Sequence, residues 1–267
     1  MSAFFSQVQL TLRWAIRDRL FYAVLGVALV MLLLVPVFSS FSMRQVQELS
    51  ITLSLSVINL ILIVVAVLLG TSTIWREIEK KYTASVLTLP LSRSSYLLGK
   101  FVGVSLFLLL TLLVLGTVSL IIISISAAGY PSEIPIPWFN LFSAYFFILL
   151  KSILIASFAI FFSTVGTSFF LPFFSTFAIY LAGSGSQEVF EYITGKYGET
   201  ISPLTVEAAR IVYYVLPNLA SFDLQVYAIY GLELPVAHIG MVVVYFIVYT
   251  SIMLFLALWT YNRRQLS

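Results

Sequence analysis

The chain has 267 residues, of which 61% are hydrophobic and only 9% are charged. Soluble globular domains carry about 25% charged residues, so this composition excludes a water-soluble fold and favours a protein embedded in a lipid bilayer. The formal net charge is +3, and the chain contains no cysteine and a single histidine, His238. These counts exclude disulfide frameworks, thiolate metal sites, cysteine nucleophiles and multi-histidine metal sites.

Residues 3–19 are predicted to form an amphipathic elbow helix at the membrane surface. The apolar stripe comprises Phe5, Val8, Leu12 and Ile16, and the polar stripe comprises Gln9, Arg13 and Arg17. A basic face directed to water suits a helix that lies in the headgroup region, which makes Arg13 and Arg17 predicted membrane-interface residues. The alternative is an ordinary basic flank of the first span.

Six segments are long and apolar enough to cross the hydrocarbon core, which takes about 20 residues of helix. They are predicted at about 20–38, 51–75, 101–127, 139–163, 165–184 and 236–260. The first run is too long for the hydrophobic region of a signal peptide, so we expect it to be retained as a span. The predicted fold class is therefore an all-α polytopic membrane protein with one domain over residues 1–267.

The distribution of lysine and arginine predicts the orientation of these spans. With six spans, one side holds Arg13, Arg17, Arg19, Arg76, Lys80, Lys81, Arg93, Lys100, Arg263 and Arg264. The other side holds Arg44, Lys196 and Arg210, together with eight acidic residues. The excess of positive charge predicts that both termini and the loop 76–100 are cytoplasmic.

The loop 76–100 lies between the second and third predicted spans and is rich in charge. Residues 82–89 can form about two helical turns, and Pro90 is expected to end them because it cannot continue a regular helix. Ser92 or Ser94 can cap the following helix through its hydroxyl. Lys100 is expected at the membrane interface, with its ammonium extended to lipid phosphate.

Two polar residues fall inside predicted spans. Lys151 lies near the middle of the fourth span, where a charge is costly and by default indicates a functional position facing the bundle interior or a water-filled path. Asn59 lies in the second span and can support helix packing. We take Lys151 and Asn59 as possible residues of a translocation path; a lysine that extends to the interface is the alternative.

The external segment 185–235 is predicted to hold two short helices, at 204–216 and 220–230, broken at Pro217 and Asn218. Both are rich in aromatic and aliphatic residues but too short to cross the membrane. A re-entrant pair or a pair at the outer interface fits this pattern, because irregular backbone at membrane depth needs protein or water to satisfy its polar groups.

The loop 76–100 resembles the cytoplasmic loop of ABC-2-type permeases, the transmembrane subunits of ATP-binding-cassette exporters. The matching residues are Arg76, Glu77, Glu79, Leu87, Pro90, Ser92, Arg93, Gly99 and Lys100. The wider layout is similar as well, since these permeases have an elbow helix, six spans, a coupling helix between spans two and three, and short re-entrant helices between spans five and six.

The resemblance implies that the loop docks on a separate ATPase subunit, which binds the ATP and magnesium, and that the chain pairs with a second permease copy. The pair would be a homodimer or a closely related heterodimer in a bacterial or archaeal cytoplasmic membrane. Leu87 and Leu89 would supply an apolar anchor beside Pro90, and Glu77, Glu79 and Arg93 would supply orienting charges. A basic loop that only binds anionic lipid is the alternative.

The motifs that are missing from the sequence restrict the function further. There is no G-x-x-x-x-G-K-[ST] phosphate loop, so the chain is not expected to bind ATP through a Walker motif. Protease and hydrolase motifs are also missing, and neither an enzyme nor a nucleic-acid-binding protein is expected. A secondary transporter or channel, and a membrane scaffold that docks a cytoplasmic complex, remain the alternatives to an exporter subunit.

Overall fold

The computed structural model describes residues 3–42, 45–79, 92–129, 135–166, 168–195 and 202–263. Every regular element in these ranges is a helix, which confirms the predicted all-α class for the part of the chain that is described. The elements are α1 (Ala3–Arg17), α2 (Arg19–Ser40), α3 (Val46–Glu79), α5 (Arg93–Gly129), α6 (Trp138–Val165), α7 (Phe170–Thr194), α8 (Pro203–Val215), the 3₁₀ helix η2 (Ala220–Phe222), α9 (Gln225–Tyr230) and α10 (Val236–Arg263).

Among the described residues, five helices are long and apolar enough to span a membrane, so the chain is a multi-pass membrane protein. They are Arg19–Ser40, Val46–Trp75, Arg93–Gly129, Trp138–Val165 and Ile239–Arg263. The predicted fifth span, 165–184, is not among them. Its helix, α7, starts at Phe170 and continues to Thr194 through a polar second half that includes Gln187 and Glu188. Six spans were predicted, and the structure supports five.

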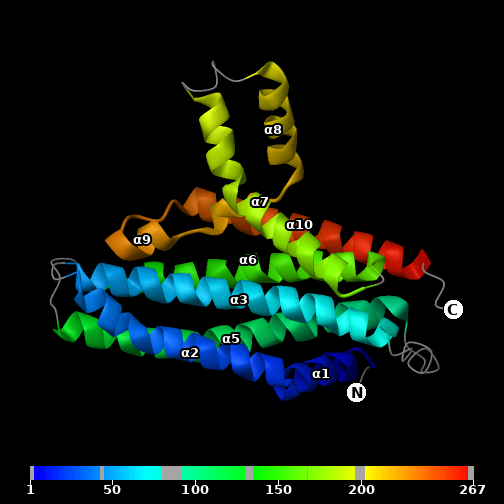
Figure 1. Ribbon diagram of the computed structural model, residues 1–267, viewed down its shortest axis with the longest axis horizontal. Helices are drawn as coiled ribbons and strands as arrows, with labels where there is room; N and C mark the ends of the chain where they lie inside the picture. Colours follow the sequence, from blue (N-terminus) through cyan, green and yellow to red (C-terminus); the bar gives the residue numbers. More distant parts are fainter. Residues whose placement is uncertain are drawn as a thin grey trace.

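The long helices lie side by side in a bundle, from which the last turns of α7 and the whole of α8 project as an arm (Figure 1). The first residue of α1, the last residues of α3 and α10 and the start of α5 lie at one end of the bundle (Figure 1). We call this end, which carries Arg93, Lys100 and Arg263, the basic end.

Helix α6 occupies the centre of the bundle and is the most buried of the five spanning helices. Its contact with α3 is close because Gly70 presents no side chain. A Cβ atom at Gly70 would lie 2.5 Å from the Cβ of Ala159. The hydroxyl of Ser163 donates to the carbonyl oxygen of Thr71 at 3.1 Å. Small residues at a helix crossing allow this close approach. In a membrane, van der Waals packing and hydrogen bonds, rather than the hydrophobic effect, drive helices to associate.

Replacing Gly70 by Ala is expected to lower the free energy of unfolding by about 1 kcal/mol, because overpacking outweighs the gain in helix propensity. The matched control is Gly116→Ala in α5, where nothing lies within 4 Å of the added Cβ. The control should be neutral or slightly stabilising. Thermal unfolding of both variants in detergent measures the difference, and equal effects would refute the close contact.

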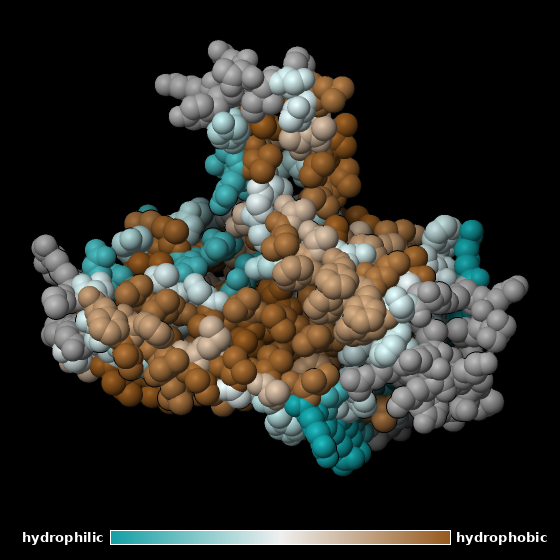
Figure 2. Space-filling view, in the orientation of Figure 1, coloured by the Kyte–Doolittle hydropathy of each residue, from teal (hydrophilic) through white to brown (hydrophobic). Residues whose placement is uncertain are grey.

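Helix α1 packs lengthwise along the first turns of α5, rather than only resting on the membrane surface as the amphipathic pattern suggested. Gly99 and Gly103 of α5 make this possible, because a Cβ at these positions would lie 3.0 Å from Gln7 and 2.7 Å from Thr11. The Arg13 and Arg17 side chains remain exposed. Figure 2 shows the resulting contrast between a hydrophilic patch at the position of α1 and the mostly apolar surface of the bundle.

Candidate functional site

The predicted coupling residues are only partly within the described structure. Leu87, Leu89 and Pro90 lie outside the described residues, as does the predicted helix 82–89. Glu77 and Glu79 belong to the last turn of α3, whose backbone is described but whose side chains there are not. Arg93 is described in full as the first residue of α5. The structure therefore shows the two flanks of the loop and not its middle.

The start of α5 is capped as the sequence predicts. The hydroxyl of Ser92 accepts a hydrogen bond from the backbone N–H of Ser95 at 3.2 Å, which satisfies one of the free donors of the first turn. Next to this cap, Nη1 of Arg93 donates to the carbonyl oxygen of Asn262 at 3.0 Å. Asn262 lies in the last turn of α10, where the helix dipole is negative and attracts a cation.

Lys100 does not extend to the membrane surface, and that prediction was wrong. Its side chain is only 2% exposed. The ammonium donates to the carbonyl oxygen of Thr73 and lies 4.8 Å from the ring centre of Tyr96. The reason is that the last turns of α3 pack against α5 and present the carbonyl oxygen of Thr73 to the ammonium. Lys100 thus ties the two flanks of the loop together.

A compact apolar cluster joins these flanks to two other helices. Its buried members are Ile74, Tyr96, Leu97, Ile160, Ala257 and Tyr261, from α3, α5, α6 and α10. The rings of Tyr96 and Tyr261 stack at 6.0 Å with an interplanar angle of 14°. The hydroxyls of Thr164 and Thr260 lie 2.7 Å apart. We call these residues, with Arg93 and Lys100, the basic-end cluster; it connects the two flanks of the loop to the ends of α6 and α10.

The second candidate site is Lys151 in the middle of α6. Its side chain is 6% exposed. The charge that acts on it electrostatically is the carboxylate of Asp223. A buried ammonium in a bundle interior is costly, and the negative charge of Asp223 favours it. The sequence pattern placed Asp223 outside the spans and did not pair it with Lys151.

Asp223 can act on the charge of Lys151 because residues 216–235, which we call the return segment, fold back against the bundle. The buried ring of Phe222 lies 6.5 Å from that of Phe147, one turn before Lys151. Nε2 of Gln225 donates to the carbonyl oxygen of Thr52 at 3.1 Å and to the hydroxyl of Ser56 at 3.2 Å, both in α3. These contacts fix the position of the return segment relative to α3 and α6.

A further anchor for the return segment comes from Asn140 at the start of α6. Its Nδ2 donates to the carbonyl oxygens of Tyr227 at 2.9 Å and Leu232 at 2.8 Å. Two backbone carbonyl groups, one inside α9 and one just after it, are thereby satisfied by protein. No motif in the sequence signals this role, because the partners of Asn140 lie about 90 residues later in the chain.

Asn59 lies at about the depth of Lys151. Parallel helices α3 and α6 pair residues that are about 90 positions apart, as the contacts of Gly70 and Ser163 show. Within the described residues, Oδ1 of Asn59 is buried without a hydrogen-bond partner. The structure therefore places Asn59 and Lys151 in the same layer of the bundle.

Comparisons with known proteins add no family assignment. No protein-family model matches the chain, and a search of curated proteins finds no significant match. Function has to be argued from the geometry of the two sites.

Proposed function

We propose that the chain is the permease subunit of an ABC-2-type exporter, driven by ATP hydrolysis on a separate subunit. The observation that carries the proposal is the basic-end cluster. It joins both flanks of the basic loop to the ends of α6 and α10 through Lys100, Arg93 and the Tyr96–Tyr261 stack. A partner that pushes on the loop would therefore move four helices together, which is what a coupling loop has to do.

The proposal includes a second copy of the chain and an ATPase subunit that binds ATP and magnesium. The lack of a phosphate-loop motif in the sequence agrees with an external motor. Lys151 is buried within a single chain. We therefore propose that it sets the position of the return segment and does not contact the transported substrate. Coupling then runs from the loop, through α6, to Lys151 and Asp223.

A secondary transporter is the second candidate, and the Lys151–Asp223 pair is the observation that favours it. Buried ionisable residues in membrane helices often belong to proton or ion relays. The two candidates differ in their source of energy. Transport by a secondary carrier would respond to an ion gradient in vesicles that contain only this chain, whereas the exporter would need the ATPase and ATP.

The experiment is purification of the tagged chain from its native membrane, followed by measurement of ATP hydrolysis in the purified fraction. Wild type should retain magnesium-dependent ATPase activity. Glu79→Lys should reduce the retained activity at least about tenfold, as loss of a central docking contact does. Arg210→Glu is the control, since it changes an exposed charge on the arm. If wild type retains no activity, or both variants behave alike, the proposal fails.

A further inference from the structure

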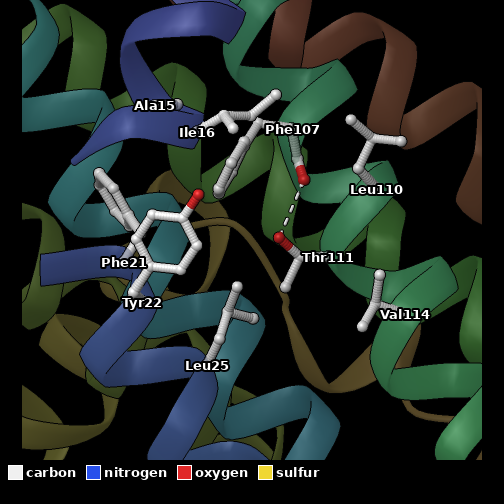
Figure 3. Close-up of a pocket in the computed structure, with 9 residues that line it drawn as sticks. All are labelled: Ala15, Ile16, Phe21, Tyr22, Leu25, Phe107, Leu110, Thr111 and Val114. Carbon is white, nitrogen blue, oxygen red and sulfur yellow. Dashed lines mark hydrogen bonds between the residues drawn. The ribbon is translucent and has the colours of Figure 1, made fainter. Parts of the chain in front are cut away.

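A small cavity lies where α1, α2 and α5 meet, and Figure 3 shows the side chains around it. The two N-terminal helices are separated there by Asp18, whose extended backbone and capping bond to the N–H of Leu20 start α2 in a new direction. The inner corner of this bend is left open against α5. The cavity has a volume of about 150 Å³. Its lining residues are Ala15, Ile16, Phe21, Tyr22, Leu25, Phe107, Leu110, Thr111 and Val114.

The lining of the cavity is almost entirely apolar. The hydroxyl of Thr111 already donates to the carbonyl oxygen of Phe107 at 2.9 Å, as the dashed line in Figure 3 marks. An apolar cavity of about this size stays dry and accepts a hydrocarbon. An empty cavity would forfeit the dispersion contacts of its walls. The exposed lining residues Ile16, Tyr22 and Val114 place its mouth on the outer surface of the bundle, where lipid chains are the available hydrocarbon.

Positive charge lies one helical turn from this mouth, on the side of the basic end. Arg13 precedes Ile16 by three residues, and Arg19 precedes Tyr22 by three residues, so each pair shares a helix face. One turn is about 5.4 Å of rise. Both arginine side chains are exposed. If the phosphate of a lipid lies between these two arginines, the acyl chain of the same lipid can extend along α2 into the cavity.

We propose that this cavity binds one acyl chain of an anionic phospholipid, whose headgroup phosphate contacts Arg13 and Arg19. The bound acyl chain would fill the space between α1, α2 and α5 and so stabilise the bend between α1 and α2. The commitment to an anionic lipid rests on charge complementarity. A larger apolar groove of about 420 Å³ lies between α5, α6 and α10, and no arginine lies within one helical turn of its lining residues. The two lysines near it along the chain, Lys100 and Lys151, are buried, so this groove should not select headgroup charge.

The test is native mass spectrometry of the full chain in detergent, with equal amounts of dioleoyl phosphatidylglycerol and dioleoyl phosphatidylcholine added. Wild type should retain one phosphatidylglycerol in preference to phosphatidylcholine. Val114→Phe should abolish retention by filling the cavity. The matched control is Leu113→Phe, the adjacent and equally exposed position, which does not line the cavity and should bind as wild type does.

The arginines should determine which lipid binds rather than whether a chain enters. Arg13→Gln and Arg19→Gln should each lower the ratio of bound phosphatidylglycerol to phosphatidylcholine roughly five-fold. Retention by Val114→Phe equal to that of wild type, or equal loss in Leu113→Phe, would overturn the proposal.

If Val114→Phe does not fold, wild type can be labelled with phosphatidylglycerol that carries a photoreactive group on its acyl chain. Label should appear in peptides containing Tyr22 or Leu110. Labelling confined to the groove residues Phe246 and Ile247 would overturn the proposal as well.

Discussion

Replacing Tyr261 by Ala should lower the free energy of unfolding by about 3–5 kcal/mol, the usual cost of removing a buried aromatic ring. Tyr261 is 2% exposed, stacks on Tyr96 and connects the end of α10 to the start of α5. The matched control is Trp259→Ala, two residues away in α10. Trp259 is 48% exposed, so detergent or lipid can replace its contacts, and the expected loss is below about 1 kcal/mol.

The two variants are compared by thermal unfolding in the same detergent. Tyr261→Phe keeps the ring stack and serves as the conservative variant; it should retain most of the stability that Tyr261→Ala loses. We also expect faster backbone hydrogen exchange in residues 92–97 of Tyr261→Ala, since the start of α5 loses its partner. If Tyr261→Ala and Trp259→Ala are equally stable, the basic-end cluster does not hold the helices together.

Substitutions of Lys151 and of Asp223 should change the free energy of unfolding differently, because Lys151 is buried and Asp223 is exposed. Asp223→Asn should lower the free energy of unfolding by about 2 kcal/mol, because it leaves a buried ammonium without a compensating charge. This is less than the loss for a fully buried pair, since Asp223 is itself exposed to solvent. Lys151→Met should be neutral or stabilising, because it removes the buried charge altogether.

The double variant Lys151→Met with Asp223→Asn distinguishes this pair from two independent effects. Once Lys151 is Met, Asp223→Asn should have little further effect, so the double variant should be about as stable as Lys151→Met alone. Chemical or thermal unfolding of the four proteins completes the cycle. Additive effects of the two substitutions would show that the residues do not interact.

Features that depend only on residues close together in the chain could be predicted from local sequence patterns. Composition and apolar length predicted a helical membrane protein, and five of the six predicted spans correspond to apolar helices of spanning length. A serine cap at Ser92 or Ser94 was predicted for the helix after Pro90, and the structure shows that Ser92 provides it. The break at Pro217 and Asn218 also separates α8 from α9 as the sequence indicates.

The sequence did not predict features that depend on segments far apart in the chain. Lys100 was expected in the headgroups because its neighbours along the chain suggest an interface, yet α3 covers it. Asp223 could not be paired with Lys151 without the fold-back of the return segment, which Asn140 and Gln225 fix through contacts to remote residues. Helix α1 packs along α5 because Gly99 and Gly103 leave room for Gln7 and Thr11. This fit cannot be seen from the sequence of either helix by itself.

The central claim, that the loop between α3 and α5 docks an ATPase, can be tested directly because the chain contains no cysteine. Single cysteines at Leu87 and Leu89 would be labelled with a photoactivatable crosslinker in native membranes and irradiated. A cysteine at Arg210, on the arm, is the control. The account predicts that Leu87→Cys and Leu89→Cys each become attached to a polypeptide that binds ATP, and that Arg210→Cys does not. Attachment of only lipid, or of no ATP-binding polypeptide, at both loop positions would contradict it.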